Sequence, residues 1–215
     1  MARVRSKFGL VCAFLLLSGA AGPAAAADDA TLLWAALREG GRVALVRHTD
    51  APGGAGDPPG FRLADCSTQR NLSKQGRADA VTLGNRFRAE KIAVGKILSS
   101  RWCRCLDTAR LMQLGVTEQS ATFDYAYAVF NRDRAGELTE GALRLISDWK
   151  GPGTLVVVTH GSNINLLTGI DPGQGGIVVV APDLASDARF RVLGHIPPGP
   201  KDRGATGNMG KIERL

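Results

Sequence analysis

Two short apolar segments that lead into histidines constrain this chain more than any other feature. Residues 43–46 run directly into Arg47 and His48, and residues 155–158 are followed two positions later by His160. Runs of Val and Leu without polar alternation are typical of parallel strands buried on both faces. Ligands of open α/β sheets bind at the carboxyl ends of such strands. The pattern therefore predicts that two histidines and an arginine meet in a site for an anionic substrate.

The first 27 residues have the pattern of a secretory signal peptide. Arg3, Arg5 and Lys7 precede a run of 14 apolar and small residues, and a series of alanines offers a cleavage site before Asp28. The run is shorter than the about 20 residues that span a membrane. We expect residues 1–27 to be removed, a periplasmic or secreted product, and no stable membrane insertion after cleavage. An uncleaved signal anchor is the alternative.

Length and charge limit the remaining chain to one domain with small anionic ligands. Removal of the first 27 residues leaves 188, which is enough for a single hydrophobic core. Three basic residues leave with that segment, so 24 Lys and Arg face 20 Asp and Glu, a charge of +4. This excess is mild and forms no basic run, which argues against a nucleic-acid-binding protein.

The mature chain keeps three cysteines, Cys66, Cys103 and Cys105. Disulfides persist in the oxidising compartments that exported proteins reach. Cys103 and Cys105 are too close in sequence to bridge comfortably. We expect Cys66 to bridge one of the two and to leave the other as a thiol. A zinc site is the alternative reading, although Cys-x-Cys with one distant cysteine lacks the usual ligand spacing.

Hydrophobic periodicity and turn residues predict alternating strands and helices. The predicted strands are residues 43–46, 92–98, 155–158, 177–180 and 190–193, and the predicted helices are one capped by Asp29 and those at 73–90, 104–114, 138–149 and 162–167. This order predicts a single three-layer α/β/α domain, residues 28–196, with a mostly parallel central sheet. Residues 197–215 begin with three Pro in four positions and are predicted to form a mobile tail.

Four segments together resemble the motifs of the histidine phosphatase superfamily, also called phosphoglycerate-mutase-like. Residues 47–49 are similar to its R-H-G signature, with Thr49 where Gly is usual. Residues 71–77 resemble the opening of its second helix, residues 99–109 resemble "S-S-P-x-x-R-A-x-Q-T-A", and residues 158–161 resemble the late "V-x-H-G" motif. Four such segments in the right order imply the histidine phosphatase fold.

A narrower resemblance concerns exported bacterial members of this superfamily. Residues 65–73 read Asp-Cys-Ser-Thr-Gln-Arg-Asn-Leu-Ser, and residues 102–109 read Trp-Cys-Arg-Cys-Leu-Asp-Thr-Ala, as in those relatives. The cysteines within both motifs agree with the expected disulfide. The relatives also tend to show a Gly-Glu pair before the late strand, where this chain has Gly175 and Gly176.

The resemblance implies a set of residue roles. His48 would be the nucleophile, because a neutral imidazole can form a covalent intermediate with phosphorus. Arg47 and Arg104 would hold the phosphoryl oxygens, since the arginine fork matches phosphate geometry. Arg104 also lies at the start of a predicted helix, whose dipole favours anions. His160 would donate a hydrogen bond to the same oxygens. The predicted substrate-binding residues beside them are Thr49, Ser162 and Asn163. Alternatives to Arg104 are Arg70, Arg77 and Arg101.

The general acid is the least evident residue. No carboxylate follows His160, and the Glu of the other branch of the superfamily is missing before Glu137. Asp133 is the nearest carboxylate and is the predicted proton donor. The other candidates are Asp57, Asp65 and Asp124. The third histidine of the chain, His195, is expected to lie outside the site.

The sequence therefore predicts an exported hydrolase of phosphomonoesters that works through a phosphohistidine. Its substrate would be a small phosphomonoester or a phosphorylated envelope sugar. Neither a metal nor a cofactor is expected, because arginines would supply the positive charge at the phosphoryl group. Two alternatives remain. The departures at Thr49 and at the missing Glu fit a protein that binds phosphate without turnover, and a phosphomutase is the second alternative.

Overall fold

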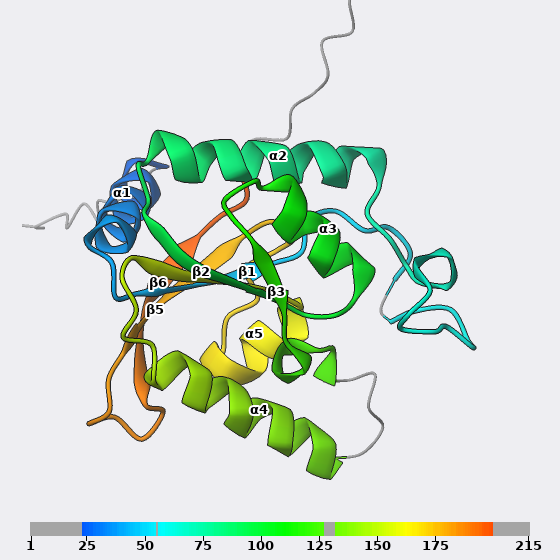
Figure 1. Ribbon diagram of the computed structural model, residues 1–215. Coiled ribbons are helices and arrows are strands. Elements are labelled where there is room, and N and C mark those ends of the chain that lie inside the picture. Colours follow the sequence, from blue (N-terminus) through cyan, green and yellow to red (C-terminus); the bar gives the residue numbers. More distant parts are fainter. Residues whose placement is uncertain (1–22, 55, 127–131, 200–215) are drawn as a thin grey trace, which may run out of the picture.

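A six-stranded sheet in the order β3-β2-β4-β1-β5-β6 forms the centre of the molecule (Figure 1). The computed structural model describes residues 23–54, 56–126 and 132–199, with side chains from residue 29 and, in the last range, from residue 135. The strands are β1 (Val43–Arg47), β2 (Val94–Ser99), β3 (Thr117–Gln119), β4 (Thr154–Thr159), β5 (Ile177–Pro182) and β6 (Phe190–Ile196). Strands β1 to β4 pair in parallel, and β5 is antiparallel to its two neighbours. The predicted, mostly parallel sheet is confirmed.

Helices cover both faces of this sheet. They are α1 (Pro23–Glu39), α2 (Lys74–Ala89), α3 (Cys103–Leu111), α4 (Arg132–Ser147) and α5 (Gly161–Thr168), with short 3-10 helices η1 (Cys66–Thr68) and η2 (Ala121–Phe123). In Figure 1, α2 and α3 lie on one side of the sheet, and α4 and α5 lie on the other. The described residues thus form the predicted α/β/α layers.

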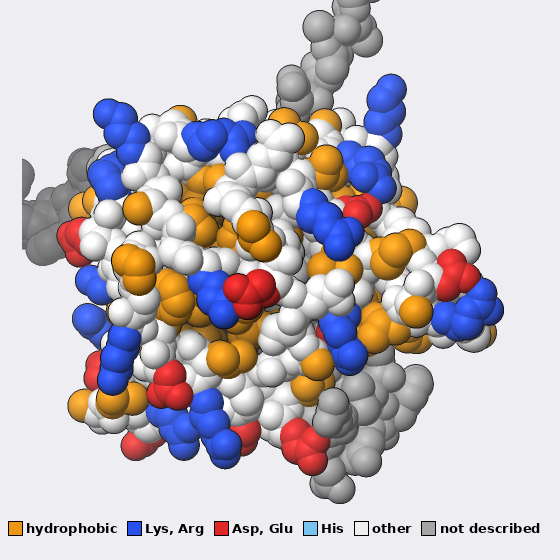
Figure 2. Space-filling view, viewed as in Figure 1, with side chains coloured by type: hydrophobic (Ala, Val, Ile, Leu, Met, Phe, Trp, Pro, Cys, Tyr) orange, Lys and Arg blue, Asp and Glu red, His pale blue; other side chains and the backbone are white. Residues whose placement is uncertain are grey.

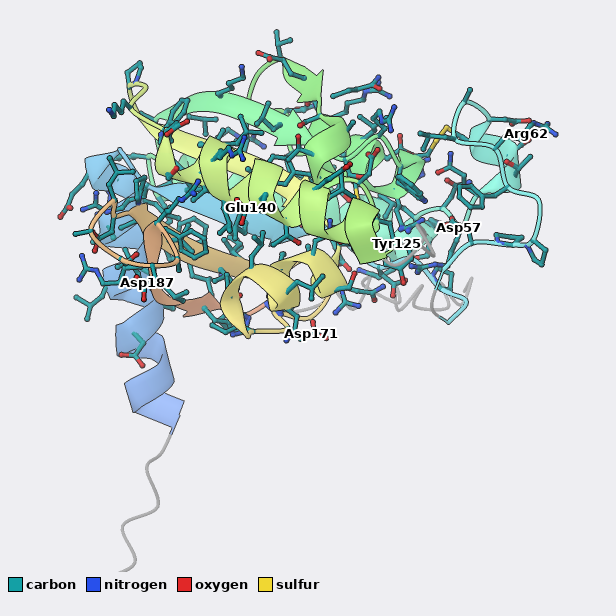
Figure 3. All side chains as sticks on the ribbon, turned by 90° about the horizontal axis from the view of Figure 1, so that it is seen from below. Asp57, Arg62, Tyr125, Glu140, Asp171 and Asp187 are labelled. Carbon is teal, nitrogen blue, oxygen red and sulfur yellow. A yellow bond between two sulfur atoms is a disulfide. The ribbon has the colours of Figure 1, made fainter. Side chains whose placement is uncertain are left out.

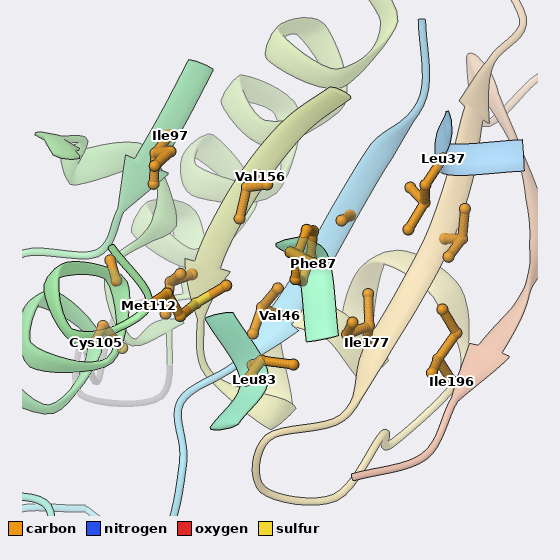
Figure 4. Packing of buried hydrophobic residues seen from close by; sticks show 14 of the residues in the cluster. Leu37, Val46, Leu83, Phe87, Ile97, Cys105, Met112, Val156, Ile177 and Ile196 are labelled. Atoms are coloured by element: carbon orange, nitrogen blue, oxygen red, sulfur yellow. The ribbon is translucent and has the colours of Figure 1, made fainter. Parts of the chain in front are cut away.

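Alternating strand residues divide the core between the two layers. Ala44 and Val46 pack with the side chains of α1, α2 and α3, and Figure 4 shows this cluster. Val43 and Leu45 point the opposite way and pack with α4 and α5. Because successive side chains of a strand point to opposite faces, one continuous apolar strand serves both clusters.

Some predicted boundaries differ from the structure. Helix α1 already begins at Pro23, so Asp29 lies inside it rather than at its cap. Helix α4 begins at Arg132, six residues before the predicted start. Strand β3 was not predicted, because Thr-Glu-Gln is short and polar and forms a strand only by pairing with β2.

The two predicted terminal segments lie mostly outside the described residues. Residues 1–22 and 200–215 are not among the described residues. The first three residues of the predicted tail are placed, and the Arg86 guanidinium donates to the carbonyl oxygen of Pro197 over 3.2 Å.

The cysteines resolve the alternatives that the sequence left open. Cys66 forms a disulfide with Cys103, with the two Cα atoms 5.7 Å apart, and Cys105 is a buried thiol.

Figure 2 shows basic and acidic side chains spread over the face seen in Figure 1 rather than gathered in one patch. Within the described residues, no helix is both long and apolar enough to cross a bilayer.

Candidate active site

Three neighbouring strands deliver the predicted residues to one edge of the sheet. Arg47, the last residue of β1, pairs with Thr159 at the end of β4, so His48 and His160 follow directly on adjacent strands. The His48 N–H donates to the carbonyl oxygen of Thr159 over 3.0 Å. The two imidazole rings lie 5.6 Å apart between centroids. Strand β2, on the other side of β4, leads into Arg104. The meeting of the two histidines that the sequence predicts is confirmed.

A cleft of about 460 Å³ opens at this edge. Figure 3 shows Tyr125 and Asp57 at this end of the molecule and Asp187 toward the other. The cleft is lined by Arg47, His48, Ala51, Gly54, Arg70, Tyr125, His160, Gly161, Ser162, Asp171 and Gln174. A hollow with two arginines and two imidazoles in its wall suits a small anion.

His48 is held as a neutral ring with one defined tautomer. Its Nδ1 lies 2.9 Å from the carbonyl oxygen of Thr49, which can only accept, so Nδ1 carries the proton. Nε2 then keeps its lone pair. Burial lowers the pKa of His48 to about 3, against the raising effect of the Thr49 hydrogen bond, and repulsion from Arg104 adds to the lowering. An unprotonated nitrogen at the cleft is the form that a nucleophile requires.

Arg47 presents its guanidinium to the cleft. Its Nη1 donates to Asp171 Oδ1 over 2.6 Å, and its buried Nε has no hydrogen-bond partner among the described residues. A Cβ atom at Gly161 would lie 2.9 Å from this guanidinium, so the glycine after His160 makes room for it. A buried donor without a partner is costly and is satisfied when an anion binds beside it.

Arg104 differs from the prediction in one respect: it lies behind the cleft wall. Its side chain is fully buried, and its Nη1 donates to Asp57 Oδ1 over 2.8 Å. Asp57 also accepts from the Trp102 indole and from the backbone N–H of Arg70, both over 2.9 Å. Asp57 therefore does not serve as an exposed acid. It neutralises and orients the buried arginine.

Arg70 lines the cleft where Arg104 was expected. Its Nε donates to the carbonyl oxygen of Gly56 over 2.9 Å, and its Nη1 donates to Ala51. Loop 51–72 thereby wraps around its own arginine and turns it toward the histidines. The sequence motifs predict Arg70 only as an alternative to Arg104, because nothing local distinguishes it from Arg77 or Arg101. Those two pair with Asp107 and Asp124, and neither lines the cleft.

His160 meets the cleft with its ring, while its nitrogens face the protein. Its Nδ1 lies 3.4 Å from Arg104 Nη2, a donor, so Nδ1 accepts and Nε2 carries the proton. Nε2 lies 3.0 Å from Ser100 Oγ, which is 3.4 Å from Asp124 Oδ1. Burial lowers the pKa of His160 well below its usual value, and Arg104 adds to this. His160 thus positions Arg104. It does not offer a free N–H to the substrate, which is the role that the sequence predicts for it.

The predicted substrate-binding residues divide between the cleft and the protein interior. Ser162 lines the cleft. Thr49 is buried and its hydroxyl donates to the Gly76 carbonyl oxygen over 2.8 Å, which fixes β1 against α2. Asn163 donates to the carbonyl oxygen of Asp124 over 2.6 Å and holds that segment in place. The structure therefore corrects the prediction for Thr49 and Asn163, whose side chains face other elements.

The carboxylate predictions have separate outcomes. Asp133 lies in the first turn of α4, and its side chain is outside the described residues. Asp65 caps η1 and accepts from Ser67. Asp124 is buried against Arg101. Asp171, which is not among the predicted site residues, lines the cleft. No local signal marks it, since a Gly-rich loop with one Asp is common on protein surfaces.

The pair Gly175 and Gly176 closes the loop that carries Asp171. A Cβ atom at Gly176 would lie 1.9 Å from the Pro172 carbonyl oxygen, so this backbone leaves no room for a side chain there. The N–H of Gly175 approaches the carbonyl oxygens of Arg47 and His48 at 3.2 and 3.3 Å.

In the described part of the chain, no three potential metal-binding side chains gather.

No protein-family model and no curated protein matches this chain. Among solved structures, the protein histidine phosphatase SixA complexed with tungstate matches with a TM-score of 0.51 at 17% identity, over 73% of this chain and 97% of SixA. The chain has the histidine phosphatase fold. A mycobacterial hydrolase matches with a TM-score of 0.51 at 16% identity, over 70% of this chain and 95% of its own. A mycobacterial glucosyl-3-phosphoglycerate phosphatase complexed with VO3 has a TM-score of 0.49 at 17% identity, over 70% and 96%.

Proposed function

We propose that this protein is an exported phosphomonoester hydrolase that works through a phosphohistidine on His48. One observation carries the proposal. The tautomer of His48 leaves Nε2 unprotonated at a cleft whose wall includes Arg47 and Arg70. The likeness to SixA concerns the fold, so the proposal rests on the site.

The site can perform each part of a double displacement. Arg47 has a free Nε–H and Arg70 lies in the same cleft, so both can pair with phosphoryl oxygens. His48 Nε2 attacks phosphorus and forms a covalent intermediate, which water then hydrolyses. The carbonyl of Thr49 keeps the Nδ1 proton in place and stabilises the positive ring of the intermediate. Arg104 and its partner Asp57 keep the wall rigid and electrically balanced.

The test is to trap the intermediate. We expect purified protein to hydrolyse p-nitrophenyl phosphate, and rapid acid-free quenching followed by mass spectrometry to find phosphate on the peptide that contains His48. His48→Ala should lower the rate by at least about 100-fold, as the loss of a nucleophile does. The matched control is His195→Gln, because His195 contacts the Pro172 carbonyl oxygen and does not line the cleft.

Other outcomes would identify the alternatives. An inert protein whose melting temperature rises with phosphate would be an anion-binding protein. Transfer of the phosphoryl group to a second hydroxyl compound, without free phosphate, would indicate a phosphomutase. Phosphate found on a residue other than His48 would overturn the proposed mechanism.

Export is the second part of the proposal and has its own test. The signal-peptide pattern of residues 1–27 supports it. We expect the protein recovered from the periplasm or medium of an expressing bacterium to begin at Asp28 by mass spectrometry. Recovery of the uncut chain in the membrane fraction would favour a signal anchor.

A further inference from the structure

Two of the acidic side chains that the structure describes near the cleft, Asp57 and Asp124, are occupied by hydrogen bonds within the protein. Asp57 is buried and accepts hydrogen bonds on both oxygens, from Arg104 and from Trp102. Asp124 is buried and accepts from Arg101 and Ser100. Each carboxylate holds an arginine or a helix start in place. Neither of these two carboxylates is placed to give a proton to a leaving oxygen.

Asp171 is placed differently. It lines the cleft together with both histidines, and its side chain is 63% exposed. Oδ1 accepts from Arg47 Nη1 over 2.6 Å and from the Gly173 N–H over 3.2 Å. Oδ2 has no hydrogen-bond partner among the described residues. One oxygen thus fixes the carboxyl group, and the largely exposed side chain leaves the other oxygen accessible.

We propose that Asp171 is the proton donor to the leaving oxygen, and that the substrates are phosphate esters of aliphatic alcohols. This inference rests on the proposed function and specifies its substrate class. An alkoxide is a poor leaving group and needs a proton in the transition state, whereas a nitrophenolate does not. A carboxyl group beside the nucleophile is of use only when the leaving group needs that proton.

The two steps balance in atoms and charge. In the first, His48 Nε2 bonds to phosphorus, the phosphorus–oxygen bond breaks, and the leaving oxygen takes the proton of the Asp171 carboxyl group. The products are the free alcohol, an Nε2-phosphohistidine and a carboxylate. In the second, a water molecule gives a proton to that carboxylate, its oxygen bonds to phosphorus, and the phosphorus–nitrogen bond breaks. Phosphate, neutral His48 and protonated Asp171 result.

A bound phosphate would share a guanidinium with Asp171. Arg47 Nη1 lies 2.6 Å from Asp171 Oδ1, and the phosphate would place its negative charge beside the same cation. The other charged or titratable groups at the cleft are Arg70, Tyr125 and the histidines His48 and His160.

The experiment compares two substrates in wild type, Asp171→Asn and the control Asp187→Asn. Asparagine can still accept from Arg47 and Gly173, so the loop geometry is retained, while the acid is lost. We expect kcat for an alkyl phosphate such as glycerol phosphate to fall about 100-fold or more in Asp171→Asn. For p-nitrophenyl phosphate we expect a change below about fivefold in the same variant. Asp187, in the turn between β5 and β6, should have no effect on either substrate.

The results separate failure of this inference from failure of the proposed function. An equal loss on both substrates would mean that Asp171 only positions Arg47 and would overturn the inference. Tighter phosphate binding with unchanged kcat would also overturn it, because Asp171 would then merely compete for Arg47. Unchanged activity of Asp171→Asn on both substrates would refute the inference and leave the phosphatase intact. A wild type that is inert on both substrates would refute the function itself.

Discussion

Single residues at this site are shaped by their neighbours more than by their own chemistry. His48 is neutral because burial and Arg104 lower its pKa to about 3, so its Nε2 stays unprotonated even in mildly acidic solution. Gly161 contributes by having no side chain, because the guanidinium of Arg47 occupies the space that a side chain at this position would need. The His-Gly pair of the motif is therefore a packing requirement for the arginine.

Gly161→Ala tests that packing. The added Cβ would lie 2.9 Å from the Arg47 guanidinium, which is too close, so the guanidinium must shift. It can do so because it is the end of a flexible side chain. We expect kcat/KM for p-nitrophenyl phosphate to fall about tenfold or more, with little change in melting temperature. The control is Gly136→Ala on α4, where the new Cβ meets nothing. It should leave activity unchanged and stabilise the fold by about 0.5–1 kcal/mol. Equal activity of Gly161→Ala and wild type would show that Arg47 does not hold the phosphate.

At the scale of elements, loop 51–72 functions as a clamp on the site. Its Asp57 holds Arg104, its Arg70 enters the cleft, and its Cys66 is tied to the start of α3 by the disulfide. The loop has little secondary structure beyond η1 and contributes little to the two apolar clusters. The disulfide therefore replaces apolar packing as the constraint that keeps Asp57 in place.

Reduction of this disulfide should loosen the clamp. The bridge closes a loop between residues 37 positions apart. Its loss is expected to lower the free energy of unfolding by about 4 kcal/mol. Activity should also fall, because Asp57 would no longer be held in place and the buried Arg104 would lose its ion-pair partner. Urea unfolding with and without a dithiol reductant measures the first effect, and hydrolysis of p-nitrophenyl phosphate measures the second.

Two cysteine variants control this prediction. Cys66→Ser should behave like the reduced protein and ignore the reductant. Cys105→Ala should remain as sensitive as wild type, because burial raises the pKa of the Cys105 thiol to about 12 and makes it a poor nucleophile for exchange with the bridge. A Cys105→Ala protein that no longer responds to reductant would contradict the assignment of the bridge.

For the whole molecule, two buried neutral histidines couple folding to pH. Burial lowers the pKa of both His48 and His160, whereas in the unfolded chain each titrates near 6.5. Below that pH the unfolded state binds protons that the folded state does not. Stability from these groups is therefore full above about pH 6.5 and is lost as the pH falls. The chemistry of the site and the acid sensitivity of the fold share one cause.

The pH dependence of stability measures this coupling. Each histidine should lower the free energy of unfolding by about 1.4 kcal/mol per pH unit between pH 6 and 4. His48→Asn removes one such group, so wild type should lose about 1.4 kcal/mol more than the variant over each unit of that range. Urea titrations at several pH values give both curves. Parallel curves would show that His48 is protonated in the folded state.

The sequence by itself determined the layers, the mostly parallel sheet and the meeting of Arg47, His48 and His160. These follow from short-range patterns, because apolar runs specify buried strands and parallel strands end at a common edge. It also limited the bridge to Cys66 with one of two cysteines. Only the tertiary structure decided which one, since Cys103 and Cys105 differ by two positions and face different surroundings.

Only the tertiary structure also decided which charged side chains surround the cleft. Asp57 and Arg104 are 47 positions apart, and Arg47 and Asp171 are 124 apart. A carboxylate becomes a clamp or a candidate acid according to what packs against it, and that packing is set by loops with no periodic signal. For the same reason, only the structure shows that Arg70 lines the cleft and that Arg104 lies buried behind it. Burial is a property of the folded chain, whereas a sequence motif contains only residue type and spacing.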